Sequence, residues 1–315
     1  MIVVTGGAGF IGSNLVRGLN ARGRTDVVVV DDLRDGHKFV NLVDCEIADY
    51  FDRDAFIERL EAGAHARPDA IFHQGACAVT TEWDGRYMLE NNYRYSVRLL
   101  EYCLENEVPL IYASSAAVYG ASNVFKESER GAERPLNVYG YSKLLFDRYV
   151  RGHLARARSQ VAGLRYFNVY GPGEAHKGAM ASVAFHLQRQ IADSGEARLF
   201  EGSGGYAAGE QRRDFVYVGD VVSVNLWLLE QPRMSGIFNV GTGASASFND
   251  VARAIIAVRG KGRIRYIPFP PELKASYQSF TEADVSALRA AGYNAPFKGV
   301  RAGIESYLSA LGPSP

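Results

Sequence analysis

Tyr139 and Lys143 are the two side chains whose types and spacing best suit proton transfer. They stand four positions apart, so on a helix they share one face. A phenol is a poor base near neutral pH because its reference pKa is about 10. A neighbouring ammonium favours the phenolate, so we expect Lys143 to lower the pKa of Tyr139. The pair therefore predicts a general acid/base centre.

Two serines are candidates to assist this pair. Ser114 and Ser115 stand at the end of the predicted strand 110–114, and in parallel sheets ligands bind at the carboxyl ends of the strands. A serine hydroxyl there can donate to a sugar oxygen as that oxygen changes between alcohol and carbonyl. We choose Ser115 as the catalytic serine and keep Ser114 as the alternative.

A glycine-rich turn near the N-terminus indicates a dinucleotide site. Gly6, Gly9 and Gly12 follow the predicted strand 2–5 and precede an amphipathic stretch. Glycines lack a Cβ, so backbone N–H groups can approach a pyrophosphate, and the helix that follows points its positive end at the same phosphates. The motif stands after a strand and before a helix, as dinucleotide binding requires.

The second predicted strand ends in two acids, Asp31 and Asp32, about 20 residues after the glycines. An acid here usually accepts a hydrogen bond from the ribose 2′-hydroxyl, which favours NAD. Arg34, Lys38 and Arg53 lie close in sequence, and their cations could instead hold a 2′-phosphate. The local residues leave NAD and NADP open.

Short apolar runs alternate with helical stretches in the first half of the chain. Each run is apolar without a period of two, as strands of a parallel sheet covered on both faces require. This alternation predicts an α/β fold with a Rossmann-type doubly wound parallel sheet. The predicted strands are 2–5, 27–31, 70–74, 110–114 and 161–164, and the predicted helices are 11–20, 53–62, 86–106 and 139–154.

Beyond about residue 170, glycine and proline interrupt shorter elements. We expect residues 1–170 to form the dinucleotide-binding domain and residues 171–315 to form mainly a smaller, mixed C-terminal lobe that binds substrate. Some of its segments, such as 236–240, are expected to return to the main sheet. The predicted helices of this half are 181–193, 218–229, 249–258 and 300–311.

The composition excludes several classes of protein. The 315 residues carry 35 Lys and Arg against 35 Asp and Glu, and this zero net charge argues against a nucleic-acid or acidic-membrane partner. No run of about 18 apolar residues predicts a membrane span. Three cysteines without a C-x-x-C pair predict neither a disulfide framework nor a metal site, and reduced thiols fit a cytoplasmic location.

Five motifs, in order along the chain, resemble the extended short-chain dehydrogenase/reductase family of nucleotide-sugar enzymes. They are the glycine turn, Ser114–Gly120, the Tyr139 and Lys143 pair, Arg165–Pro172 and Arg213–Val218, and the match covers essentially the whole chain. A closer resemblance is to the epimerases of this family that act on an ADP-linked heptose. It rests on runs that the general fold does not need: 36–42, 80–85, 175–178, 180–186 and 200–203.

The resemblance implies an isomerase that inverts carbon 6 of ADP-heptose and so makes the heptose donor for the inner core of lipopolysaccharide. It implies bound NADP, in spite of Asp31, with NAD as the alternative, and a homo-oligomer, often a pentamer. Inversion of a carbinol carbon calls for oxidation and re-reduction by the cofactor. The two faces of the sugar carbon then ask for two proton-transfer groups.

The resemblance also assigns roles residue by residue. Tyr139 matches the catalytic acid/base, Lys143 the cofactor-binding lysine, and Lys177 a second base that also stands at a cofactor position. By composition alone Lys177 would be a surface lysine. The further positions that match cofactor contacts are Gly6, Gly9, Phe10, Ile11, Gly12, Asp31, Asp32, Lys38, Arg53, Gln74, Gly75, Ala76, Cys77, Ala78, Asn91 and Val169. Positions that match substrate contacts are Asn168, Ala179, His186, Phe200, Glu201, Gly202, Ser203, Arg213 and Tyr277.

Arg213 is assigned to the substrate diphosphate because a guanidinium fits phosphate oxygens in a fork. Arg212 is the alternative, and a salt bridge from Arg213 to Asp214 or Glu210 would be the purely structural explanation. The chain departs from the family pattern at two places. Ala179 stands where a substrate-binding serine can occur, and the segment 204–211 forms a longer insertion.

Three alternative functions remain at this stage. Dehydratases of the superfamily usually carry an Asp-Glu pair after the strand-end hydroxyl, whereas this chain has Ala116 and Ala117, which cannot move a proton. Another nucleotide-sugar 4-epimerase or reductase fits the fold and the shared motifs. A non-catalytic dinucleotide sensor is the alternative of a different class, although the intact Tyr139 and Lys143 argue against it.

Overall fold

The computed structural model describes residues 1–270 and 278–312, and the chain divides into two compact units. Unit 1 is made of Met1–Gly120, Glu133–Tyr166 and Val222–Phe238. Unit 2 is made of Ala121–Ala132, Phe167–Val221 and Asn239–Pro315. The chain therefore leaves unit 1 after Gly120, Tyr166 and Phe238, and returns to it at Glu133 and at Val222.

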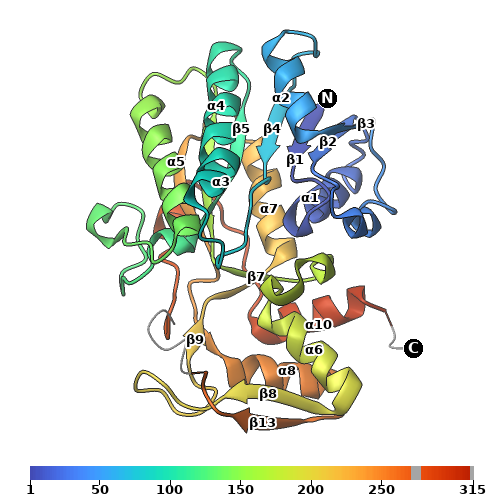
Figure 1. The fold of residues 1–315 in the computed structure, drawn as a ribbon, viewed down its shortest axis with the longest axis vertical. Coiled ribbons are helices and arrows are strands. Elements are labelled where there is room, and N and C mark those ends of the chain that lie inside the picture. The colour runs from blue at the N-terminus through green and yellow to red at the C-terminus, as the bar shows by residue number, and fades with distance from the viewer. Residues whose placement is uncertain (271–277, 313–315) are drawn as a thin grey trace. The chain divides into compact units, whose positions relative to one another are not determined.

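A seven-stranded sheet lies at the centre of unit 1 (Figure 1). The strand order is β11-β6-β5-β4-β1-β2-β3, and the neighbouring pairs from β6 to β3 are all parallel. This confirms the predicted doubly wound α/β fold and the return of segment 236–240 to the main sheet. The bounds are β1 (Ile2–Thr5), β2 (Val27–Asp31), β3 (Asp49–Asp52), β4 (Ala70–His73), β5 (Leu110–Ser115), β6 (Val161–Tyr166) and β11 (Gly236–Val240).

Helices cover both faces of this sheet, which explains the unbroken apolar sequence of its central strands. On one face, Phe56, Leu100 and Phe146 from three helices share a core cluster with Val3 of β1. On the other face, Gly18 of the first helix packs closely against the helix that carries Val222. A Cβ at Gly18 would lie only 2.6 Å from Val222 Cγ1. The helices are α2 (Arg53–Glu61), α4 (Tyr95–Glu105) and α5 (Val138–Leu154) on the first face, and α1 (Phe10–Asn20) and α7 (Val218–Leu229) on the second.

The strand order reverses between β1 and β4, which are neighbours in the sheet. From β1 the chain runs outward to β2 and β3, and then crosses back to β4, β5 and β6. Ligands of open α/β sheets bind at the carboxyl ends of the strands beside such a reversal. The glycine turn, Asp31, Gln74 and Ser115 all stand at carboxyl ends of these strands.

Two elements of unit 1 differ from those predicted. β3 was not predicted because its sequence Asp-Tyr-Phe-Asp is not apolar, and it forms because an edge strand pairs on one side only and stays partly exposed. The single helix predicted over 86–106 is divided into α3 (Gly85–Leu89), a π-helical turn (Glu90–Arg94) and α4. The π-helical turn buries Asn91 and Asn92.

Unit 2 combines helices with short strands. Its short strands form two-stranded sheets: β7 (Asn168–Tyr170) with β10 (Phe215–Tyr217), β9 (Arg212–Arg213) with β12 (Ala246–Ser247), and β8 (Glu196–Phe200) with β13 (Arg263–Ile267). Its helices are α6 (Val183–Ser194), α8 (Phe248–Arg259), α9 (Ser286–Ala290) and α10 (Val300–Ala310).

The core of unit 2 lies among α6, α8 and α10. Leu187 and Ile191 of α6 pack with Ile255 of α8 and Ile304 of α10. A capping box starts α8, and Gly260, at a φ of +67°, ends it. Over the residues that the structure describes, no helix combines the length and the apolarity needed to cross a membrane.

Candidate active site

The glycine turn between β1 and α1 is so tight that only glycine fits. Gly6 has a φ of +67°, and a Cβ there would lie 2.6 Å from the backbone nitrogen of Gly75. A Cβ at Gly12 would lie 2.1 Å from the carbonyl oxygen of Gly6. Gly9, Phe10 and Ile11 follow from this turn into the first turn of α1. This cradle at a helix N-terminus fits the pyrophosphate of a dinucleotide.

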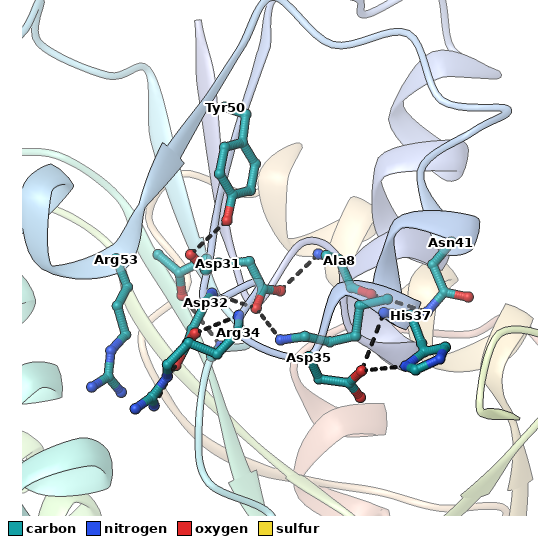
Figure 2. Close-up of polar contacts among 12 residues, drawn as sticks. Ala8, Asp31, Asp32, Arg34, Asp35, His37, Asn41, Tyr50 and Arg53 are labelled. Atoms are coloured by element: carbon teal, nitrogen blue, oxygen red, sulfur yellow. Dashed lines mark hydrogen bonds and ion pairs between the residues drawn. The ribbon is translucent and has the colours of Figure 1, made fainter. Parts of the chain in front are cut away.

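Asp31 at the end of β2 is buried, with 7% of its surface exposed. Its carboxylate accepts hydrogen bonds from the backbone N–H of Ala8 (2.8 Å) and of Asp32 (2.7 Å), and Figure 2 shows the first of these bonds. The Lys38 ammonium lies 2.6 Å from the same carboxylate. Asp31 therefore fixes the glycine turn to β2, and Lys38 balances its charge.

Two arginines lie beside Asp32 in the same region (Figure 2). Arg34 Nε donates to Asp32 Oδ2 at 2.7 Å, and this bond is the largest cause that holds the pKa of Asp32 below its usual value. The charge of Arg53 acts in the same direction. Arg53 also donates to the side chain of Asn91 and lies 3.3 Å from Asp54. The predicted cofactor residues Asp31, Asp32, Lys38, Arg53 and Asn91 thus gather at one strand end.

The loop that follows β4 carries the predicted cofactor positions Gln74 to Ala78. Gln74 accepts from the Tyr166 hydroxyl at 3.1 Å, and Gly75 N–H donates to Thr5 Oγ1 at 3.2 Å. Cys77 exchanges two backbone hydrogen bonds with the Asn92 side chain, at 2.8 and 2.9 Å. Asn92, which sequence reasoning missed, therefore fixes the course of this loop. The side chains of Ala76 and Ala78 are exposed.

Tyr139 and Ser115 form a hydrogen-bonded pair that joins α5 to the end of β5. Burial raises the pKa of Tyr139, and the hydrogen bond from Ser115 opposes this rise. The prediction that Lys143 lowers the pKa of Tyr139 is therefore wrong. Desolvation by burial raises this pKa by more than the lowering effects reduce it. Ser115 Oγ also accepts from the backbone N–H of Ala117 at 3.1 Å.

Lys143 lies one turn further along α5 and is buried. Its ammonium donates to the carbonyl oxygen of Ala113 at 2.9 Å. Burial lowers the pKa of Lys143 to about 8, and the charge of Asp147 opposes this shift. Near neutral pH the helix thus presents an ammonium that loses its proton readily.

Asp147 was missed by the sequence analysis, although its spacing of four residues from Lys143 places it on the same helix face. Its buried carboxylate accepts from Tyr112 (2.9 Å), Ser114 (3.0 Å) and Arg165 (2.8 Å). Arg165 in turn pairs with the buried Glu133 at 2.6 Å. This network ties α5 to β5 and β6. It also separates the two candidate serines, because Ser114 is buried in the network while Ser115 meets Tyr139.

Lys177 of unit 2 lies on a 3-10 turn, Ala175–Met180, with Gly178 beside it at a φ of +52°. The side chain is half-buried. Burial lowers the pKa of Lys177, and the charge of Glu174 opposes this shift. Ala179, where a serine can stand in the family, is exposed on the same turn.

The other predicted substrate and cofactor positions of unit 2 lie on several elements. Arg213 stacks on the Phe248 ring at 5.9 Å and donates to the carbonyl oxygen of Arg212 at 3.1 Å. The carboxylate of Asp214 accepts hydrogen bonds from the backbone N–H groups of Thr242, Gly243 and Ala283, so it holds loops of its own unit.

The remaining predicted positions are spread along unit 2. Asn168 and Val169 lie on β7, His186 on α6, Phe200 at the end of β8, and Glu201, Gly202 and Ser203 in the loop after it. Tyr277 lies outside the described residues.

The inserted segment 204–211 follows this loop and is held by α8. Asn249 donates to the carbonyl oxygen of Ala208 at 2.9 Å and to Glu210 at 2.6 Å. Gly209 N–H donates back to the carbonyl oxygen of Phe200 at 3.0 Å. The insertion therefore packs on its own unit. Among the residues described, no group of three or more His, Cys, Asp or Glu could hold a metal ion.

Comparison with known proteins extends these observations. Residues 2–241 match the NAD dependent epimerase/dehydratase family. An ADP-L-glycero-D-manno-heptose-6-epimerase from Alkalilimnicola ehrlichii is 59% identical over 316 residues, which cover 100% of this chain and 98% of that protein. The crystal structure of the Helicobacter pylori ADP-L-glycero-D-manno-heptose-6-epimerase is 33% identical, with a TM-score of 0.84 over 98% of this chain and 95% of that one. A Thermus thermophilus UDP-glucose 4-epimerase in complex with NAD is 29% identical, with a TM-score of 0.79 over 98% and 97% of the two chains.

Proposed function

The chain belongs to the NAD dependent epimerase/dehydratase family, and on this basis we propose that it interconverts ADP-D-glycero-β-D-manno-heptose and ADP-L-glycero-β-D-manno-heptose. The reaction inverts carbon 6 of the heptose and supplies the heptose donor for the inner core of lipopolysaccharide. The observation that carries this proposal is the Ser115 and Tyr139 pair beside the buried Lys143, at the strand ends that also hold the glycine cradle.

A nicotinamide dinucleotide fits the residues of unit 1. When bound, the dinucleotide would supply hydride chemistry: it would accept a hydride from carbon 6 and return it, which would permit inversion. The glycine turn would hold the pyrophosphate, and Gln74–Ala78 would line the site. Lys143 would hold the nicotinamide ribose, with Asn91 and Val169 as further contacts.

We propose that the dinucleotide is NADP. Asp31 already accepts two backbone hydrogen bonds and a Lys38 ammonium, which leaves it less suited to a ribose hydroxyl. The Arg34 guanidinium is 74% exposed, and Arg53 lies near the same acid, Asp32. Guanidinium groups suit a 2′-phosphate because they donate in a fork.

Two groups would move protons, one for each configuration of the carbon 6 hydroxyl. Tyr139, assisted by Ser115, would take or give the proton in one configuration, and Lys177 would do so in the other. The lowered pKa of Lys177 supports this role, because an amine that titrates nearer to neutral pH can act both as base and as acid.

The substrate residues would come mainly from unit 2. Arg213 is suited to the diphosphate, and the stack on Phe248 limits the directions its guanidinium can take. Asn168, Ala179, His186, Phe200–Ser203 and Tyr277 complete the set that the family resemblance assigns.

A homo-oligomer also belongs to this proposal, with the pentamer as the expected assembly. Phe39, Val40 and Val43 expose between 53% and 74% of their surface within five residues of unit 1, and grouped apolar side chains of this kind favour association. Light scattering on the purified protein tests this, because a monomer at micromolar concentration would contradict it.

The function is tested in two steps on purified protein. Denaturation should release NADP, identified by mass spectrometry. Fresh protein, without added cofactor, is then given ADP-D-glycero-β-D-manno-heptose and, separately, UDP-glucose, and the products are followed by NMR. We expect inversion at carbon 6 of the heptose only. Conversion of UDP-glucose would favour a 4-epimerase, and no conversion by cofactor-loaded protein would favour a sensor.

A further inference from the structure

Glu174 is a buried carboxyl group that the two-base proposal does not use. Only 1% of its surface is exposed. It stands between β7 and the 3-10 turn that carries Lys177, three residues before that lysine. Burial raises the pKa of Glu174, and its hydrogen bonds with Ser182 oppose the rise. A buried carboxyl group is costly unless its partners are well placed, so its contacts call for an explanation.

The partners of Glu174 lie at both ends of the loop from Gly171 to Ser182. Its carboxylate accepts from the backbone N–H of Gly171 at 3.3 Å, before the turn. After the turn it accepts from the backbone N–H of Ser182 at 2.6 Å and from the Ser182 hydroxyl at 2.7 Å. One side chain thus closes the whole loop.

The same contacts anchor the loop to regular structure on each side. Ser182 caps α6, because its Oγ accepts from Phe185 N–H at 3.2 Å. Inside the loop, Lys177 N–H donates to the carbonyl oxygen of Glu174 at 3.0 Å. The backbone then turns sharply at Gly178, at a φ of +52°, which favours glycine. The place of the Lys177 amine therefore depends on this closed loop.

Charge links the two residues as well. The charge of Glu174 acts on Lys177, on its own loop, and on Tyr307, on α10. The carboxylate raises the pKa of Lys177 against the larger, lowering effect of burial. Without it, Lys177 would lose its proton at a lower pH.

We propose that Glu174 is a positioning residue for Lys177, whose carboxylate closes the Gly171–Ser182 loop and fixes both the place and the charge of the amine. The proposal rests on the proposed function, in which Lys177 exchanges a proton with the carbon 6 hydroxyl of a nucleotide sugar. Glu174 itself need not touch the substrate.

The test compares Glu174→Gln with a matched control, Glu305→Gln, which changes an exposed glutamate on α10 of the same unit. Trace acetylation with acetic anhydride, followed across pH by mass spectrometry of the peptide with Lys177, reports the titration of this amine without any turnover. We expect the labelling midpoint of Lys177 to fall in Glu174→Gln and to stay at the wild-type value in Glu305→Gln.

Turnover of the ADP-heptose gives the second readout. We expect Glu174→Gln to lower kcat roughly 10- to 100-fold, as a displacement of a reacting group by about 1 Å does, with a smaller change in KM. Glu174→Asp keeps the charge but shortens the side chain, so its labelling midpoint should return toward wild type while kcat stays reduced. This second variant decides the matter if Glu174→Gln does not fold.

Two results would overturn the proposal. One is an unchanged or higher labelling midpoint in folded Glu174→Gln, and the other is wild-type kcat in either Glu174 variant. Failure of the proposed function looks different, because then the wild-type protein would not invert carbon 6 of the ADP-heptose, whereas failure of the two-base proposal alone would leave Lys177→Met with full turnover. If Lys177→Met is inactive while the Glu174 variants behave as wild type, the positioning role alone is rejected.

Discussion

Lys143 and Lys177 show two ways of holding a lysine whose pKa is lowered by burial. Lys143 lies on a 17-residue helix, and Lys177 lies on a six-residue turn. Each stands near a buried carboxyl group on its own segment, Asp147 in unit 1 and Glu174 in unit 2. In both cases the carboxylate opposes the effect of desolvation on the amine.

The two carboxyl groups differ in what holds them. Asp147 is held by Tyr112, Ser114 and Arg165, which are distant in sequence and lie on two strands. Glu174 is held by Gly171 and Ser182 of its own loop. In unit 1, the carboxylate beside the lysine is therefore fixed by hydrogen bonds to two strands of the central sheet. In unit 2, it is fixed by hydrogen bonds within one loop. We expect damage at the first to disturb folding and damage at the second to disturb mainly turnover.

Removal of the phenol should have the largest effect on turnover. We expect Tyr139→Phe to lower kcat by roughly 10²- to 10⁴-fold, because general acid/base catalysis contributes about this much. The variant should keep its bound cofactor, measured by mass spectrometry after denaturation. Unchanged turnover would remove Tyr139 from the mechanism.

Removal of the unit 2 amine should come close to this effect. Lys177→Met deletes one of the two proposed proton-transfer groups, so inversion should fall roughly 10²-fold or more. The circular dichroism spectrum should match that of the wild type, because the hydrogen bonds of Glu174 with Gly171 and Ser182 remain. Full turnover with a normal spectrum would reject the two-base proposal.

The unit 1 network should control stability. Asp147→Asn leaves the buried Arg165 with one carboxylate fewer, so we expect a loss of about 3–5 kcal/mol in the free energy of unfolding. Urea unfolding measures it, with Glu305→Gln as a control that should change the free energy by less than about 0.5 kcal/mol. A loss as small as that of the control would mean that the network does not secure unit 1.

The buried ammonium of Lys143 should lower the free energy of unfolding at neutral pH. Its pKa is lowered from 10.5 to about 8, so below pH 8 both the folded and the unfolded chain carry the charge, and its burial costs about 3 kcal/mol. Above that pH the folded chain loses the proton first, and the cost disappears as the pH rises toward 10.5. Lys143→Met should therefore gain stability at pH 7 by up to this amount, less the bond to Ala113.

Urea unfolding at pH 7 and at pH 10 checks this prediction. The advantage of Lys143→Met over wild type should shrink between the two pH values. An advantage that is absent at pH 7, or that grows with pH, would contradict the buried-ammonium interpretation.

Apolar runs in the sequence predicted the central sheet well, because buried parallel strands need continuous apolar residues. β1 and β2 have the predicted bounds, and α7 as well. The edge strand β3 and the π-helical turn at Glu90–Arg94 were not predictable in the same way. The first depends on a neighbour that supplies the pairing, and the second on buried Asn91 and Asn92 side chains.

Motifs predicted which residues of the candidate site belong together, but not how they are held. The spacing of Asp147 from Lys143, and of Glu174 from Lys177, was visible in the sequence. The spacing alone does not show that these carboxyl groups are buried, since burial depends on how the folded chain packs Arg165 of β6 against Asp147 and closes the Gly171–Ser182 loop around Glu174. The pKa of Tyr139 failed as a prediction for the same reason, because desolvation is a property of the packed chain.

The contact between Asp31 and Ala8 has a consequence for redesigning coenzyme preference. A substitution of Asp31 that is meant to favour one dinucleotide over the other also removes the hydrogen bond between the glycine turn and β2. Such a change is expected to lower the affinity for both coenzymes. Selectivity is better sought at Arg34, whose guanidinium reaches outward and anchors no backbone.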